Sequence, residues 1–168
     1  MTINATKPLL LSLKPCYADL VFEGLKKAEL RRRIAPHITD RDVFIYVSSP
    51  IMAIHGGFQV GKVWHGTPEE VWRMVSRLVG VNKPDFDTYF EGQTVAYALE
   101  IKEVWECSQP ISLGTLRNKF SNFAVPQSWR YVRTDEHQFF RKMKPQTETC
   151  LEQHQRLSQP LAPRYAHM

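Results

Sequence analysis

A short stretch near the N-terminus carries an unusual density of side chains that could do chemistry. Residues 26–33 read Lys-Lys-Ala-Glu-Leu-Arg-Arg-Arg. Side chains alternate between the two faces of a strand, so Lys27, Glu29, Arg31 and Arg33 would share one face. The stem of Lys26 is long enough to reach over that face. Because neighbouring cations favour an ionised carboxylate, the pattern predicts a polar cleft floor on which Glu29 acts as a base or accepts a nucleobase amino group.

The same composition also fits a strand with no functional role. A solvated strand at a sheet edge carries mixed charge because charge prevents edge-to-edge aggregation. Only Ala28 and Leu30 would give residues 26–33 an apolar face. The residues by themselves leave both interpretations open.

A second group of candidate residues lies late in the chain, in the polar run Gln127-Ser128-Trp129-Arg130. Amide and hydroxyl groups hydrogen-bond base edges, an indole ring stacks on bases, and arginine binds phosphate. Ser48 adds a hydroxyl at a strand end. Four more rings lie on or beside predicted strands, and for Trp64 and Tyr97 a place in the core is favoured; the four are Tyr46, Trp64, Tyr97 and Tyr131.

Sequence patterns that bind metals or nucleotide cofactors are missing. The six histidines and three cysteines lack metal-ligand spacing, and no CxxC pair occurs. The chain also has no GxSxG, Walker or GxGxxG motif. We therefore expect neither a metal ion nor a cofactor.

Charge favours an anionic partner. The net charge is +5, with eight Lys and Arg against five acids in residues 1–60 and seven against two in residues 110–144. If these stretches meet in space they form one basic face. No apolar run is long enough to cross a bilayer and no signal peptide is evident, so a cytoplasmic location without a membrane partner is expected.

The chain alternates between short β-rich runs and amphipathic segments. This mixture favours an α+β fold, a small mixed β-barrel of five to six strands with helices inserted between them. One domain is predicted over residues 1–142, followed by a polar, loosely ordered tail over 143–168. Strands are predicted at 8–13, 26–33, 43–47, 51–64, 95–105 and after 126, and helices at 15–24, 67–79, 84–90, 112–119 and 135–141.

The spacing Gly24-x-Lys26-x-x-Glu29-x-Arg31 is similar to the GxKxxExR signature of the ASCH family, relatives of the PUA domain. The resemblance extends over residues 8–133, through segments 11–20, 42–50, 64–66, 97–101 and 126–128. It implies a small β-barrel with a cleft beside the signature strand. Family members are thought to bind RNA or act in RNA metabolism; some remove an acyl group from a modified cytidine, and at least one is reported to cut RNA.

The resemblance also bears on individual residues. In the deacylating branch the signature lysine is catalytic, together with a threonine and a distant glutamate. Lys26 matches that lysine, whereas Glu29 stands where the threonine would be. Glu91 and Glu100 are candidates for the distant glutamate.

Three functions follow from these observations. The first is a binding module for RNA or a modified nucleotide, with a basic cleft made by the residues of 26–33 and 127–130 named above. The second is a hydrolase acting on an N4-acylcytidine-type nucleoside or on single-stranded RNA, in which Lys26 is base or nucleophile and Glu29 positions it. The third is an adaptor whose basic face meets an acidic protein.

Binding to duplex DNA through a helix-turn-helix is not expected. The predicted helices at 67–79 and 84–90 are close in sequence, but the second would be the recognition helix. It carries Asp85 and Asp87, with Glu91 just beyond it, and Lys83 is its one cation. A phosphate backbone would repel that face.

Overall fold

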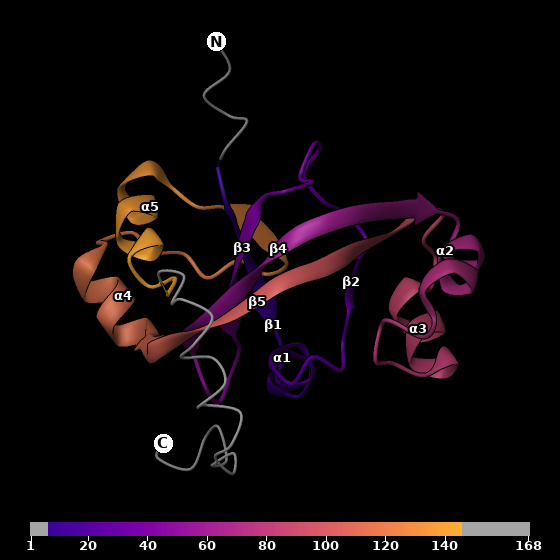
Figure 1. Cartoon of the computed structure of the whole chain (residues 1–168), viewed down its shortest axis with the longest axis horizontal. Coiled ribbons are helices and arrows are strands. Elements are labelled where there is room, and N and C mark those ends of the chain that lie inside the picture. The colour runs from indigo at the N-terminus through magenta and orange to yellow at the C-terminus, as the bar shows by residue number, and fades with distance from the viewer. Residues whose placement is uncertain (1–6, 146–168) are drawn as a thin grey trace, which may run out of the picture.

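Six strands form one sheet in the computed structural model, which describes residues 7–145. The strands are β1 (Leu9–Leu13), β2 (Ala28–Arg31), β3 (Asp42–Val47), β4 (Ala53–Gly66), β5 (Ala96–Ser112) and β6 (Trp129–Tyr131). The helices are α1 (Pro15–Phe22), α2 (Pro68–Val75), α3 (Lys83–Phe90), α4 (Leu113–Lys119) and α5 (Thr134–Arg141). Figure 1 shows the arrangement of these elements.

The sheet is mixed and strongly curled. Its order is β2-β5-β4-β3-β1-β6, with β1 and β3 parallel and the other pairs antiparallel. Register shifts interrupt the β4–β5 ladder three times, and bulges of this kind bend strands. Gly56 and Gly57 lie in that bend, where a Cβ would clash with the carbonyl oxygens of Trp105 and Val43. The resulting half-barrel brings the two edge strands, β2 and β6, toward each other.

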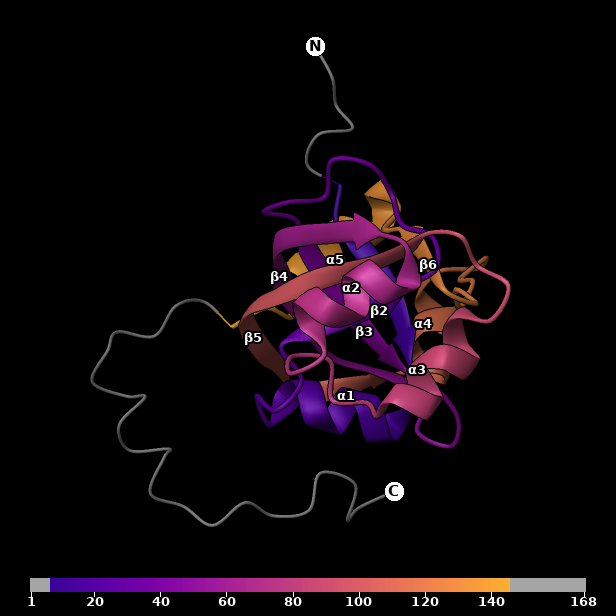
Figure 2. The same ribbon diagram turned by 90° about the vertical axis from the view of Figure 1, so that its right-hand side faces the viewer.

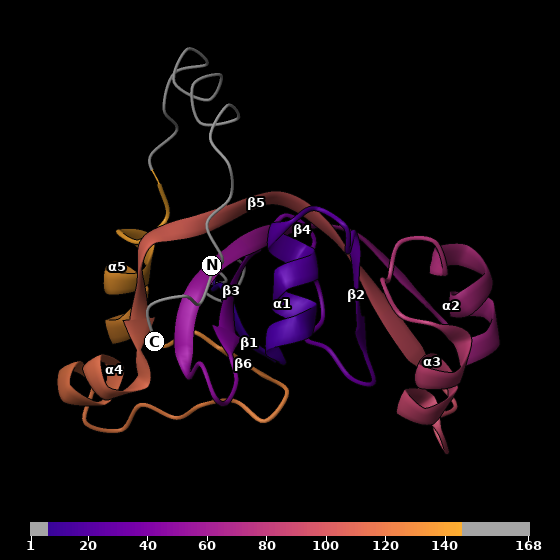
Figure 3. The same ribbon diagram turned by 90° about the horizontal axis from the view of Figure 1, so that it is seen from below.

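Helices cover the sheet at three places. Helix α1 packs Ala18 and Val21 inside the arch of the half-barrel, a placement visible from below in Figure 3. Helices α2 and α3 cover one end of the sheet and α4 and α5 the other (Figures 1 and 2). Each group has its own apolar cluster, so the core consists of one cluster inside the arch and two outside it.

The predicted α+β class and barrel-like sheet with inserted helices are confirmed. Every predicted strand and helix is present, although β2 is shorter than the predicted 26–33 and β5 runs on to Ser112. The interpretation of 26–33 as a solvated edge strand is wrong. Strand β2 does lie at an edge, but all four of its residues are buried because α2 and α3 pack on one side and the arch encloses the other.

The predicted domain boundary at residue 142 stays a prediction. Met143 packs against the cluster beneath α4 and α5, and Lys144 Nζ lies 3.0 Å from Asp42 Oδ1, so the chain is still attached there. Residues 146–168 of the predicted tail lie outside the described part. Between residues 7 and 145 no helix combines the length and apolar character required to traverse a membrane.

Candidate functional site

Strand β2 places two charged side chains inside the arch. Ala28 and Leu30 point outward and pack into the apolar cluster beneath α2 and α3. Because side chains alternate along a strand, Glu29 and Arg31 point to the opposite face. Both are 5% exposed, so these two charged groups are buried inside the arch. Lys27 was predicted to share their face, but it lies before the strand and is exposed, as are Arg32 and Arg33 after Arg31.

Lys26 reaches the same place from the turn before β2. Its side chain is buried, and Nζ donates a 2.6 Å hydrogen bond to the carbonyl oxygen of Val79. Nζ also lies 3.3 Å from Glu29 Oε2. An ammonium group has three protons, so these two acceptors leave one for a ligand.

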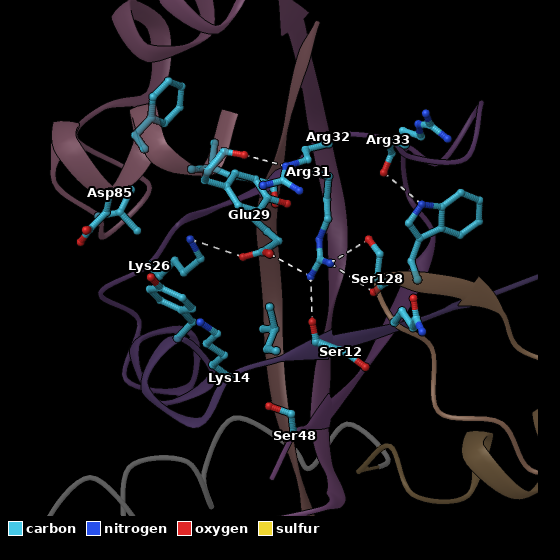
Figure 4. Close-up of a pocket in the computed structure, with 18 of the residues that line it drawn as sticks. Ser12, Lys14, Lys26, Glu29, Arg31, Arg32, Arg33, Ser48, Asp85 and Ser128 are labelled. Carbon is cyan, nitrogen blue, oxygen red and sulfur yellow. Dashed lines mark hydrogen bonds and ion pairs between the residues drawn. The ribbon is translucent and has the colours of Figure 1, made fainter. Parts of the chain in front are cut away.

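Arg31 joins the two edges of the half-barrel. Its NH2 lies 2.9 Å from Glu29 Oε1 and donates to the carbonyl oxygen of Ser12 on β1 at 3.1 Å. Its NH1 donates to the carbonyl oxygen and to Oγ of Ser128 at 3.1 and 3.2 Å. The guanidinium thus bridges β2 to the chain entering β6, where no backbone ladder pairs the two strands. Figure 4 shows this chain of contacts from Lys26 through Glu29 to Arg31.

The three groups lie in a cavity of about 1030 Å³. Five cationic and two acidic side chains line it, giving a net charge of +3 when all are ionised. Charged and polar side chains from both halves of the chain converge on it (Figure 4): Ser12, Lys14, Lys26, Glu29, Arg31, Arg32, Arg33, Ser48, Asp85, Thr88, Gln93, Gln127 and Ser128. A concave site with cations around one buried carboxylate can hold an anionic ligand and move a proton at its centre.

Aromatic side chains complete the walls. The ring of Tyr17 on α1 lies 5.7 Å from Lys26 Nζ, and burial raises the pKa of Tyr17 above its usual 10.0, assisted by the nearby Cys16, Asp85 and Glu29. Burial likewise raises the pKa of Tyr89 on α3. Both phenols therefore keep their protons at neutral pH. Trp129 lines the opposite wall and donates its indole N–H to the carbonyl oxygen of Arg33 at 3.0 Å.

The structure brings most of the predicted site residues together. Eight of the nine line the cavity: Lys26, Glu29, Arg31, Arg33, Ser48, Gln127, Ser128 and Trp129. Arg130 does not, because its NH1 and NH2 lie 2.7 and 2.8 Å from the two carboxylate oxygens of Glu136, which is fully buried. Its guanidinium also covers the ring of Phe123, so Arg130 holds α5 against β6.

The other predicted aromatic rings lie elsewhere. Tyr46 is buried in the cluster beneath α4 and α5, and Trp64 packs against the cluster beneath α2 and α3. Tyr97 faces His65, and Tyr131 stacks against Arg41. None of these rings lines the cavity.

Sequence patterns did not reveal the wall built by α3. Asp85, Thr88, Tyr89 and Gln93 line the cavity because the insertion between β4 and β5 folds back beside β2. A helix face is recognised by its apolar stripe, and these are the polar residues of that helix and its end. Tyr17 shares the apolar face of α1 in the sequence, which gives no sign that it borders a cavity.

The two candidate glutamates for a deacylation site do not reach the cavity. Glu91 is exposed just beyond α3, and Glu100 Oε2 accepts the backbone N–H of Lys62 at 2.7 Å. The acidic residues that line the cavity are Glu29 and Asp85. The lysine, threonine and glutamate of the deacylating branch are therefore represented here by Lys26 alone.

Comparisons with known proteins place these features in a family. The family model described as ASCH domain matches residues 11–117. A Zymomonas mobilis protein named ASCH domain-containing ribonuclease is 28% identical over 142 residues, covering 84% of this chain and 95% of that protein. The large ribosomal subunit protein uL22 of Ureaplasma parvum is 26% identical over 130 residues, covering 77% of this chain and 40% of that protein.

Solved structures agree with the sequence comparison. The crystal structure of ASCH from Zymomonas mobilis has a TM-score of 0.76 at 27% identity, covering 84% of this chain and 99% of that one. Two variants of the same protein, one with a tyrosine replaced by phenylalanine and one with a serine replaced by alanine, give TM-scores of 0.77 and 0.78 at 26% identity. They cover 83% and 85% of this chain and 99% and 100% of theirs.

Proposed function

This chain is a member of the ASCH domain family, and we propose that it cleaves single-stranded RNA in the cavity around Lys26, Glu29 and Arg31. The observation that carries the proposal is the convergence of these three buried charged groups on one cationic hollow. The ribonuclease name of the Zymomonas relative, which aligns over nearly its whole length, supports RNA as the substrate.

Cleavage of RNA by its own 2′-hydroxyl needs three kinds of group. A base takes the proton of the 2′-hydroxyl while its oxygen forms a bond to phosphorus. Cations and hydrogen-bond donors stabilise the charge on the non-bridging oxygens. An acid gives a proton to the 5′-oxygen as its bond to phosphorus breaks, which leaves a 2′,3′-cyclic phosphate and a 5′-hydroxyl.

The cavity offers each of these groups. Glu29 is the base, since its carboxylate is held between Lys26 and Arg31 and carries no competing backbone partner among the hydrogen bonds of residues 7–145. Lys26, Arg31 and the hydroxyl of Ser128 surround the place where the phosphate would lie. Tyr17 is the acid for the leaving oxygen, since it lines the cavity with its ring 5.7 Å from Lys26 Nζ and its raised pKa keeps the phenol protonated at neutral pH.

Base recognition belongs to the wall near β6. Gln127 supplies an amide at the cavity edge, and Trp129 supplies a ring whose orientation is fixed by its hydrogen bond to Arg33. An aromatic ring stacks on any base, whereas an amide hydrogen-bonds a particular edge. Stacking on Trp129 would therefore hold a single-stranded RNA whatever its sequence, and the amide of Gln127 would recognise one base.

The direct test uses a 5′-labelled single-stranded RNA and the purified full chain. Wild type should produce a ladder of shorter fragments ending in cyclic phosphate. Lys26→Ala should slow cleavage by at least about 100-fold, whereas Lys27→Ala, which replaces the exposed neighbour that does not line the cavity, should leave the rate unchanged. A thermal melt of both variants separates loss of chemistry from loss of fold.

Other outcomes would overturn the proposal in distinct ways. Binding of the RNA without any fragment would leave a binding module in place of an enzyme. Release of acetate from N4-acetylcytidine, with no RNA fragments, would indicate an amidohydrolase. Equal rates for Lys26→Ala and Lys27→Ala would show that cleavage does not occur in this cavity.

A further inference from the structure

The cleavage mechanism proposed above assigns no role to the cationic side chain of Arg32. It follows Arg31 at the end of β2, points toward α3 and lines the cavity. Its Cζ lies 4.5 Å from the ring centroid of Tyr89, and its Nε donates a 2.6 Å hydrogen bond to the carbonyl oxygen of Tyr89 (Figure 4). The side chain is nevertheless exposed.

An exposed arginine on a protein surface normally moves among many rotamers, and this one is held. The hydrogen bond at Nε and the contact of the guanidinium with the ring restrain its position. The ring is fixed in turn, since Tyr89 packs edge-on against Phe90, with centroids 4.8 Å apart, and is mostly buried. No carboxylate lies within ion-pair distance of Arg32 in residues 7–145.

We propose that Arg32, stacked on Tyr89, is a second base-stacking subsite of the cavity, occupied by a nucleobase of single-stranded RNA. Unpaired bases stack on arginine planes as well as on aromatic rings. The guanidinium offers its outer face to such a base, because its inner face is covered by Tyr89. Its charge is available to the adjoining phosphate, because no acidic side chain neutralises it.

The position of this subsite defines the length of the ligand. Trp129 is on β6, next to Ser128, which contacts Arg31, whereas Tyr89 is on α3 and contacts Arg32. Both rings line the cavity, so the central charged groups lie between two stacking surfaces. A single nucleoside can use one surface only. The cavity volume of about 1030 Å³ is at the upper end of roughly 300–1,000 Å³ for small-molecule sites. The substrate therefore spans at least two nucleotides, with the cleaved phosphate between its bases.

The test follows stacking directly and does not depend on cleavage, although the inference rests on the proposed RNA substrate. Tetranucleotides with 2′-O-methyl riboses cannot be cut by their own 2′-oxygen, and each carries 2-aminopurine at one of the four positions. Stacking quenches the fluorescence of 2-aminopurine. Wild type should quench it at two positions, one for each surface.

The informative variant is Arg32→Lys, which keeps the charge and loses the plane. It should abolish quenching at one of the two positions and weaken binding by about 5- to 100-fold. Removing the base at that position should weaken binding to wild type by a similar factor and to Arg32→Lys hardly at all. Arg141→Lys, on the exposed side of α5, is the matched control and should behave as wild type.

The results separate the two proposals. If Arg32→Lys quenches as wild type does, or if the missing base costs the same affinity in both proteins, the subsite is overturned whether or not RNA is cleaved. If quenching depends on Arg32 but no RNA is cut, the subsite stands and the proposed cleavage fails. If no tetranucleotide binds, the subsite is overturned, and the cleavage of labelled RNA decides the proposed function by itself.

Discussion

Arg31 is the side chain whose replacement should alter the molecule most. It contacts Glu29, Ser12 and Ser128 and is buried, so it holds the two edges of the half-barrel together. Lysine keeps the charge, but its donors all lie on one nitrogen and cannot span three partners arranged around a planar guanidinium. Arg31→Lys should lower the free energy of unfolding by about 2 kcal/mol, measured by urea denaturation. Arg33→Lys, at an exposed side chain, should change it by less than about 0.5 kcal/mol.

Tyr17 gives a pH-dependent prediction at the same scale. Its pKa is raised above 10.0, so deprotonation of this group should halve wild-type cleavage only at a pH above 10.0. Tyr17→Phe should lower kcat by about 100-fold near pH 7 with little change in KM. Equal kcat values for the two proteins would exclude Tyr17 as the acid.

Helix α2 depends on a capping box that should titrate. The backbone N–H of Thr67 donates to Glu70, and the Thr67 side chain accepts from the Glu70 N–H in return. The hydrogen bond from the Thr67 backbone lowers the pKa of Glu70 below its usual 4.5. A lowered carboxyl pKa contributes stability above pH 4.5 that is lost as the pH falls through the lowered value.

The measurement compares Glu70→Gln with wild type across that range. The substitution should destabilise the protein at pH 7, and the difference should shrink below pH 4.5 and be lost as the pH falls through the lowered pKa of Glu70. A cost of Glu70→Gln that is constant from pH 7 to pH 3 would contradict the role of the charge.

Local sequence signals are sufficient to predict which helices and strands are present. Long-range packing determines where some of them end and which residues meet at the site. Pro15, Thr67-Pro68 and Ser112 mark helix starts by their own chemistry, and those helices begin where expected. The alternation of apolar and polar residues predicts a strand over 95–105, which is shorter than β5. Strand β5 continues to Ser112 because the start of β4 pairs with its end. Such pairing between distant segments leaves no periodic pattern in either one.

The residues of the site also fall into those that local sequence predicts and those that only long-range packing brings together. The motif placed Lys26, Glu29 and Arg31 together because they are close in sequence, with Glu29 and Arg31 on β2 and Lys26 in the turn just before it. Gln127 and Ser128 were found by composition, although nothing in the sequence shows that Arg31 would contact them. Tyr89 and Arg32 were missed as a pair because they are 57 residues apart and meet only when α3 folds back on β2.

At the scale of the whole molecule, the basic balance of the chain becomes a measurable property of binding. The net charge of +5 is spread over the sequence, but the cavity concentrates a net +3. A cation that contacts an RNA phosphate releases a condensed counterion, whereas one elsewhere on the surface does not. The salt dependence of affinity therefore reports which cations face the strand.

Arg33 and Arg141 make a matched pair for this measurement, since both are exposed and only Arg33 lines the cavity. For single strands, each phosphate contact contributes about −0.7 to the slope of log K against log salt concentration. Arg33→Ala should therefore reduce the slope by about 0.7, whereas Arg141→Ala should leave it unchanged. Because both variants lose one unit of net charge, a general electrostatic attraction would reduce both slopes equally. That equality would mean the RNA is held by the overall charge of the protein and not by this cavity.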